Sequence, residues 1–250
     1  MNRYDQIIQL LKTNGYLNVN ELCIQLKVSP ATIRRDLHVM EQNSLIKRVS
    51  GGAILIQSSA QGYTNPSDKF INEKKRIAKK AVSYIEPGMT LFIDSGSTNH
   101  EIAKLLLDIP NIFVITNSIH IAYLLISNER GNSVFVCGGS ISEGKETGIV
   151  GVMAEMAVSY FRADLFLMGV SNVNINHGIT DPYIPASNIK KKMIDYSTQV
   201  FLVADHSKFG TMSKAFVAEI DTVDRIITDD LLSESELKLI RQKGIPIDLV

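Results

Sequence analysis

The segment 28–37, with the sequence VSPATIRRDL, constrains the fold more than any other ten residues of this chain. Ser29 is a favourable N-cap residue, because its hydroxyl can accept a hydrogen bond from a backbone N–H of the first turn. Pro30 suits the first helical position, where its missing N–H would have had no partner. Apolar residues then recur at helical spacing and predict a buried stripe made of Ile33, Leu37 and Met40. The segment therefore begins a short amphipathic helix.

The opposite face of this helix carries groups that suit contact with DNA. At about 100° per residue it contains Ala31, Arg35 and His38, flanked by Thr32 and Arg34. An arginine near the start of such a helix can enter the major groove and pair with guanine through two hydrogen bonds. A solvated surface helix would also accommodate two arginines, so the pair alone leaves both interpretations open.

The preceding residues supply the partner helices of a helix-turn-helix. Ile7, Ile8, Leu10 and Leu11 predict an amphipathic first helix that ends at Asn14-Gly15. Asn20 is expected to cap a second helix, with Glu21 in its first turn. The short link 27–28 then leads to the third helix, so 21–42 reads as a helix-turn-helix.

A β-hairpin follows these helices. The apolar segments 45–49 and 53–56 flank Ser50-Gly51-Gly52, a turn suited to a hairpin, and the hairpin is the natural wing of a winged helix. Residues 1–56 hold seven lysines and arginines against four acidic residues, a net charge of +3 in a chain that is neutral as a whole. Segregated positive charge favours phosphate contacts with double-stranded DNA. The expected DNA-binding residues are Ser29, Thr32, Arg34, Arg35 and His38, with Lys47 and Arg48 on the wing.

The 250 residues are enough for this small domain and a larger one. We expect a winged helix-turn-helix domain over 1–57, a linker over 58–70 and a larger domain over 71–250. No apolar run approaches the roughly 20 residues of a membrane span, and no signal peptide is evident, so we expect a cytoplasmic protein without a membrane partner. Cys23 and Cys137 fall in different predicted domains, and neither the cysteines nor the histidines show metal-ligand spacing.

From Thr90 onward, short apolar strands alternate with helices. Strands are predicted at Leu91–Asp94, Phe113–Thr116, Val134–Cys137, Asp164–Gly169, Val200–Ala204 and Arg225–Thr228. Helices are predicted at Asn99–Leu107, Ile119–Ser127, Val152–Phe161, Ser187–Ser197 and Glu234–Lys243. This alternation indicates an α/β fold with a mostly parallel sheet covered on both faces. Ligands of such sheets bind at the carboxyl ends of the strands.

Polar clusters follow several of these strands. Asp94, Ser95, Gly96, Ser97 and Thr98 precede a helix and can bind an anion through backbone N–H groups and hydroxyls, although an ordinary capped turn would look the same. In the segment 205–210, Lys208 can provide a charge for a phosphate, and Asp205 can accept from a hydroxyl or orient the lysine. The remaining candidates are Thr116, Asn117 and Ser118, suited to sugar hydroxyls, and Gly138 and Gly139, which equally suit a plain loop.

These motifs resemble the DeoR family of bacterial regulators of sugar metabolism. The resemblance rests on Val28-Ser29, on 32–37, and on Arg48 with 51–53, and it extends to the polar clusters of the larger domain. It implies a sensor domain with the fold of sugar-phosphate isomerases and coenzyme A transferases, a phosphorylated sugar as effector, and a repressor in preference to an activator. Because DNA half-sites require at least a dimer, we expect a homodimer or homotetramer. Ser50 departs from the larger residue usual in the family, and Pro185-Ala186-Ser187 lacks a glutamate that relatives often carry.

The alternative is an enzyme, because the same fold supports isomerisation of sugar phosphates. Such a reaction needs a base and a group that stabilises the enediolate, and Asp94, Asp181 or Asp205 with Lys208 are candidates for these roles. An isomerase has no use for a winged helix-turn-helix, so we expect a regulator without catalytic residues or a cofactor.

Overall fold

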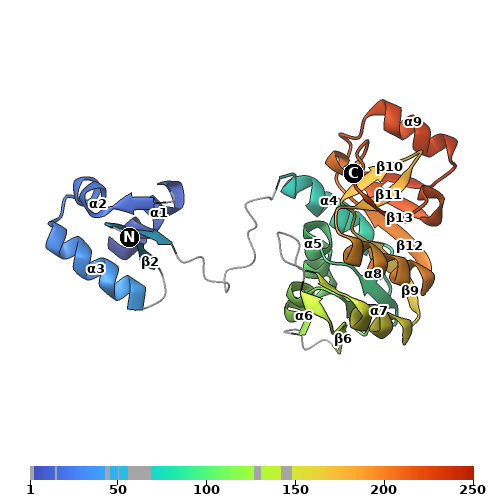
Figure 1. Cartoon of the computed structure of the whole chain (residues 1–250), viewed down its shortest axis with the longest axis horizontal. Coiled ribbons are helices and arrows are strands. Elements are labelled where there is room, and N and C mark those ends of the chain that lie inside the picture. Colours follow the sequence, from blue (N-terminus) through green and yellow to red (C-terminus); the bar gives the residue numbers. More distant parts are fainter. Residues whose placement is uncertain are drawn as a thin grey trace. The chain divides into compact units, whose positions relative to one another are not determined.

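The computed structural model describes residues 3–14, 16–42, 46–49, 51–55, 69–126, 131–141 and 148–250. The chain divides into two compact units, Met1–Ser67 and Asp68–Val250 (Figure 1). Ser50 and most of the predicted linker 58–70 lie outside the described residues, and the predicted domain boundaries stay predictions.

The described residues of the smaller unit form three helices and three strands around their own core. The elements are α1 (Arg3–Asn14), β1 (Tyr16–Asn18), α2 (Val19–Leu26), α3 (Pro30–Gln42), β2 (Ile46–Val49) and β3 (Gly52–Leu55). Ile33, Leu37 and Met40 are all buried, which confirms the stripe expected on the third helix. They pack with Ile7 and Leu11 of α1, so the helix-turn-helix is closed by the first helix.

The second helix begins two residues earlier than expected. Asn18, and not Asn20, is the N-cap residue, and its side chain accepts from the backbone N–H of Glu21 at 2.9 Å. Glu21 in turn accepts from the backbone N–H of Asn18 at 2.8 Å, which completes a capping box. The prediction was wrong because both asparagines are good caps, and only Asn18 stands three residues before a glutamate.

The predicted hairpin is present and belongs to a three-stranded sheet. β2 and β3 pair antiparallel, and β1 pairs with the other edge of β3, an interaction that local sequence patterns did not predict. Gly52 lies where β1 and β3 meet. A Cβ added to Gly52 would stand 2.3 Å from the carbonyl oxygen of Leu17, so only glycine allows this approach of the two backbones.

An ion pair joins the first helix to the third. Asp36 is buried, and its carboxylate accepts hydrogen bonds from Nε and Nη2 of Arg3 at 2.5 and 3.0 Å. Asp36 follows Arg34 and Arg35 directly in the sequence but lies on the inward side of α3. The two arginines are exposed on its outward side.

The larger unit is built on a seven-stranded sheet. The strand order is β15-β14-β12-β9-β4-β5-β6, and all neighbours are parallel. The strands are β4 (Thr90–Ile93), β5 (Phe113–Thr116), β6 (Ser133–Val136), β9 (Ala163–Met168), β12 (Ser197–Val203), β14 (Arg225–Thr228) and β15 (Ile247–Leu249). The central strands are apolar almost throughout because helices cover both faces, which confirms the predicted fold class.

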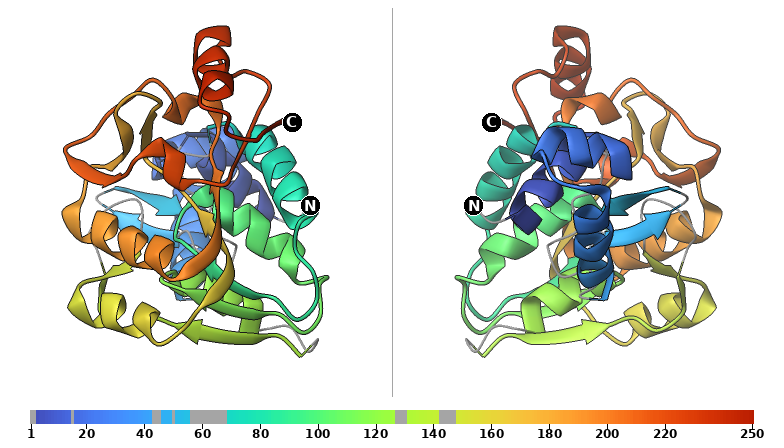
Figure 2. Two further views of the ribbon diagram at one scale, coloured as in Figure 1. Left: turned by 90° about the vertical axis from the view of Figure 1, so that its right-hand side faces the viewer. Right: turned by 90° about the vertical axis from the view of Figure 1, so that its left-hand side faces the viewer.

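Two helical layers enclose this sheet (Figure 2). One core cluster packs the first face against α4 (Ile71–Val82), α5 (Ser97–Leu106) and α6 (Ile119–Ile126). The other packs the second face against α7 (Val152–Ser159), α8 (Ile184–Asp195) and α9 (Glu234–Gln242). No helix among the described residues is long and apolar enough to cross a membrane.

Two small antiparallel sheets were not predicted. One joins β10 (Asn172–Asn174), β11 (Gly178–Asp181) and β13 (Ala215–Ala218), and the other joins β7 (Ser140–Ile141) to β8 (Ile149–Val150). β10 and β11 form a hairpin, and β13 pairs with β11 from more than 30 residues further along the chain. β11 ends at Asp181, so this sheet brings that residue near Lys190 and Asp94, at the carboxyl end of β4.

Candidate nucleic-acid interface and ligand pocket

The outward face of α3 presents the side chains expected to contact DNA. Arg34, Arg35 and His38 are exposed, and Thr32 is half-buried. Ser29 caps the helix: its Oγ accepts from the backbone N–H of Thr32 at 3.3 Å and lies 2.9 Å from the Thr32 hydroxyl. The cap fixes the start of the helix and leaves both arginines available for bases or phosphates.

A groove runs between this helix and the wing. It is lined by Arg34 and Leu37 of α3, by Arg48, Gly51 and Gly52 of the wing, and by Asn18, Val19 and Asn20 at the start of α2. Two guanidinium groups from separate elements thus share one hollow beside a helix N-terminus, an arrangement that suits a DNA phosphate. The side chain of Lys47 lies outside the described residues.

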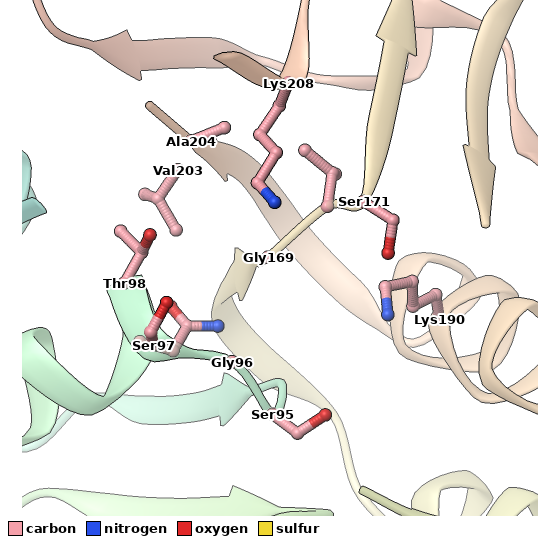
Figure 3. Close-up of a pocket in the computed structure, with 12 residues that line it drawn as sticks. Ser95, Gly96, Ser97, Thr98, Gly169, Ser171, Lys190, Val203, Ala204 and Lys208 are labelled. Atoms are coloured by element: carbon pink, nitrogen blue, oxygen red, sulfur yellow. The ribbon is translucent and has the colours of Figure 1, made fainter. Parts of the chain in front are cut away.

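A second pocket lies in the larger unit, at the carboxyl ends of β4, β9 and β12 (Figure 3). Its lining consists of Ser95, Gly96, Ser97, Thr98, Asn99, Gly169, Val170, Ser171, Lys190, Val203, Ala204 and Lys208. Ligands of parallel sheets collect at this edge because helix N-termini and flexible loops meet there. Five of these residues were expected from the sequence, and seven were not.

The start of α5 forms one wall of this pocket. Gly96 is the N-cap, with a φ of 134° and no side-chain cap for the helix. The first backbone N–H groups of a helix have no partner within the helix, so those of Ser97 and Thr98 are available to an anion. Lys208, from the 3-10 turn η1 (His206–Lys208), extends its amino group into the same pocket (Figure 3). Within the described ranges it forms no ion pair.

A buried lysine forms the opposite side. Nζ of Lys190 lies 2.8 Å from Oδ2 of Asp94 and 3.4 Å from Oδ2 of Asp181. Ser171 donates to the same Asp181 oxygen at 3.2 Å. Burial raises the pKa of the Asp94 carboxyl, and Lys190 acts in the opposite direction. The two lysines line the pocket, while the two carboxylates lie behind Lys190.

Asn99 ties two of the strand ends together beneath the pocket. Its Nδ2 donates to the carbonyl oxygens of Asp94 and Leu167, each at 3.0 Å. These two bonds fix the orientation of the amide, because both acceptors require the nitrogen. Oδ1 of Asn99 is then left buried without a hydrogen-bond partner among the described residues. An unpaired buried acceptor is costly, and a hydroxyl from a ligand would satisfy it.

The other residues expected from the sequence lie outside the pocket lining. Asn117 supports the pocket, because its Oδ1 accepts from the backbone N–H of Ser95 at 2.9 Å. Thr116 and Ser118 bond locally at the start of α6. Gly138 and Gly139 follow β6 and do not reach the pocket. Asp205 forms no ion pair with Lys208 and instead caps η1, accepting from the N–H and hydroxyl of Ser207.

Lys190 is the main residue that the sequence interpretation missed. A signal was present, because Lys190 lies next to Ile189 and three positions before Met193, on the buried stripe of α8. A lysine at a core position needs a buried partner. The sequence could not identify that partner, because Asp94 and Asp181 come from different sheets.

Comparisons with known proteins match both units of the chain. The family model for the DeoR-like helix-turn-helix domain matches residues 3–59, and the one for the DeoR C terminal sensor domain matches residues 69–230. A glycerol-3-phosphate regulon repressor of Haemophilus influenzae is 34% identical over 250 residues, covering 97% of each chain. The transcriptional repressor GlcR of Bacillus subtilis is 32% identical over 243 residues, covering 96% of this chain and 93% of that protein.

Among solved structures, a ribose-5-phosphate isomerase in complex with phospho-erythronic acid aligns with a TM-score of 0.40 and 19% identity, over 54% of this chain and 52% of that one. A similarity of this extent has no bearing on function. The winged helix and the sensor domain together define a DNA-binding transcriptional regulator. The chain belongs to the DeoR family, as the two matching domains show.

Proposed function

We propose that this protein is a repressor of sugar-metabolism genes whose affinity for its operator is set by a phosphorylated sugar in the pocket of the larger unit. The observation that carries the proposal is the position of Lys208, whose amino group enters the pocket at the uncapped start of α5. An ammonium group and free helix N–H groups together make a site for a phosphate.

The opposite side of the pocket supports a ligand with hydroxyl groups. There the hydroxyl of Ser171, which donates to Asp181, can accept from a ligand, and Lys190 is a donor held in place by two carboxylates. Beneath the pocket, Oδ1 of Asn99 is an acceptor without a partner among the described residues. A phosphate at one end and hydroxyls at the other describe a sugar phosphate or a polyol phosphate. Glycerol 3-phosphate, which names the regulon of the Haemophilus influenzae relative, is a small member of this class.

The protein is expected to bind DNA as a homo-oligomer, because helix-turn-helix proteins read paired half-sites with paired recognition helices. We propose that it has no enzymatic activity, and its relatives are named as regulators. Asp94 has a raised pKa, as a catalytic acid or base often does, but it is fully buried behind Lys190. Asp181 is likewise buried and shares the lysine, so neither carboxylate faces the pocket as a free base.

Operator binding in the presence of sugar phosphates tests the proposal. DNA from beside the protein's own gene would be titrated with the full-length protein, with and without glycerol 3-phosphate, a pentose phosphate and a hexose phosphate. We expect salt-dependent, sequence-selective binding that one of these compounds changes, while the unphosphorylated sugars have no effect. Conversion of a sugar phosphate without DNA binding would instead establish the enzyme.

A further inference from the structure

The turn η1 has two sides, and only one of them faces the pocket. Lys208 enters the pocket, whereas the ring of His206, two residues earlier, packs edge-on against Phe70 with the ring centroids 4.5 Å apart. Internal hydrogen bonds hold the turn, including one from the Lys208 N–H to the Asp205 carbonyl oxygen at 3.1 Å. The turn is short and bonded internally, so Lys208 and His206 belong to one hydrogen-bonded unit.

His206 contacts two neighbours: Asp229, which is bound through hydrogen bonds, and Phe70, which is in packing contact only. Its backbone N–H donates to Oδ2 of Asp229 at 2.8 Å, and its Nδ1 lies 2.8 Å from Oδ1 of the same carboxylate. Asp229 is fully buried and also accepts from the backbone N–H of Leu231, so it has little freedom to follow the histidine. The rings of His206 and Phe70 are in packing contact only, so Phe70 can move more easily than Asp229 when His206 shifts.

Phe70 has an unfavourable backbone conformation. Its φ and ψ are 64° and 35°, in the left-handed region that a residue with a bulky side chain rarely adopts. It is the N-cap residue of α4, yet it provides no side-chain cap for that helix. Such a conformation persists only where surrounding contacts impose it, and the ring of His206 is one of those contacts.

Phe70 also lies close to the point where the chain enters the larger unit, which begins at Asp68. We propose that the His206–Phe70 ring contact transmits occupancy of the pocket to the start of α4, and so changes how the DNA-binding unit is tethered. This inference rests on the proposed function, because it requires an anionic ligand at Lys208. A ligand that draws Lys208 toward α5 shifts η1, and the His206 ring against which Phe70 packs shifts with it.

The test compares full-length variants for the coupling between ligand binding and operator binding. Phe70→Ala removes one ring, and His206→Asn removes the other while keeping an amide that can donate to Asp229. Calorimetry gives the affinity for glycerol 3-phosphate and for inorganic phosphate, and fluorescence anisotropy gives the operator affinity with and without each compound. We expect both variants to keep their ligand affinity and their ligand-free operator affinity within about threefold of the wild-type values. The ratio of operator affinity with ligand to operator affinity without ligand should change to about one.

Two controls separate the ring contact from general effects. Phe70→Tyr keeps the ring and should keep the wild-type ratio, and Lys69→Ala changes the exposed neighbouring residue and should do the same. Hydrogen exchange of the amides of 70–76 should respond to the ligand in the wild-type protein and not in Phe70→Ala. Ligand binding with an unchanged ratio in both ring variants would overturn this inference alone. Failure of the wild-type protein to bind inorganic phosphate, glycerol 3-phosphate, a pentose phosphate and a hexose phosphate alike would overturn the proposed function and the inference together.

Discussion

Nζ of Lys190 lies 2.8 Å from Oδ2 of Asp94, although the lysine belongs to α8 and the aspartate follows β4, on the other side of almost 100 residues of chain. Their side chains are 6% and 0% exposed, so neither charge is hydrated to any useful extent. Asp181, which is 4% exposed, completes the group. The three residues hold together the central sheet, the small antiparallel sheet and α8 beside the pocket.

Removing the shared lysine should destabilise the larger unit. Lys190→Met leaves two buried carboxylates without a cation, and breaking a buried ion pair from one side costs about 3–5 kcal/mol. Urea unfolding followed by circular dichroism would measure the loss. Lys191→Met, which changes the exposed neighbouring lysine, should leave the free energy of unfolding nearly unchanged. An equal effect of both substitutions would show that the buried ion pairs are not what stabilises this region.

The stability contributed by Asp94 should decrease as the pH rises. Burial raises the pKa of this carboxyl in the folded protein above its ordinary value of 3.8, so folding favours the protonated form. The contribution is therefore complete below about pH 4 and is lost as the pH rises through the folded pKa. The difference in unfolding free energy between the wild-type protein and Asp94→Asn should fall over this range. A difference that grows with pH would mean that Lys190 lowers the pKa of Asp94 more than burial raises it.

Lys208 should be required for the ligand response and not for DNA binding. Lys208→Gln removes the charge that the pocket offers to a phosphate, and losing one charge-assisted hydrogen bond should weaken ligand binding roughly 10- to 100-fold. Operator affinity without ligand should stay near that of the wild-type protein. Lys214→Gln removes an exposed charge elsewhere in the larger unit and serves as the control. An unaltered ligand response in Lys208→Gln would exclude this lysine from the site.

Arg35 should contribute to the recognition of specific bases. It is exposed on the outward face of α3, and Arg35→Ala should cost about 1–3 kcal/mol at the operator and relax the preference for one base pair. Competition binding with operators mutated one base pair at a time would show both effects. Arg241→Ala removes another exposed arginine, from α9, and should change neither. A uniform loss of affinity across all operators would assign Arg35 to the phosphates instead.

Gly52 should be intolerant of even the smallest side chain. A Cβ at this position would lie 2.3 Å from the carbonyl oxygen of Leu17, so Gly52→Ala must push β1 away from β3. Overpacking of this kind costs about 1–3 kcal/mol, which thermal unfolding of the smaller unit would detect. Gly138→Ala, where an added Cβ meets nothing within 4 Å, is the matched substitution. Equal stability of the two variants would contradict the close pairing of β1 and β3.

The elements that the sequence predicted are those with a strong local pattern. β5 and β14 have the expected bounds because each is an apolar segment between a helix and a polar turn. α3 was predicted from its cap and its buried stripe. By contrast, β10 is Asn-Val-Asn, and its pairing with β11 has no local signal that distinguishes it from a loop.

The pocket was predicted in part for the same reason. Gly96 and Ser97 were identified because a strand, a glycine and a helix follow one another in the sequence. Lys190 was missed because its role depends on which strand ends the fold brings beside α8. Asn117 was assigned to the ligand, and its hydrogen bond to Ser95 instead places it in a supporting position. Local patterns thus indicated where the strands end, and the tertiary fold decided which side chains face the pocket.

The pairing of β1 with β3 has a consequence for the choice of operator. Because β1 lies between α1 and α2 in the chain, the wing is fastened to two helices that pack in the same core as α3, which carries the recognition face. The angle between the wing and α3 therefore has little freedom to adapt to a groove of different width. The DNA duplex must therefore deform to fit the protein. The free energy of this deformation depends on the stiffness of the base steps. Base pairs that no side chain touches should then help to determine which operators are occupied.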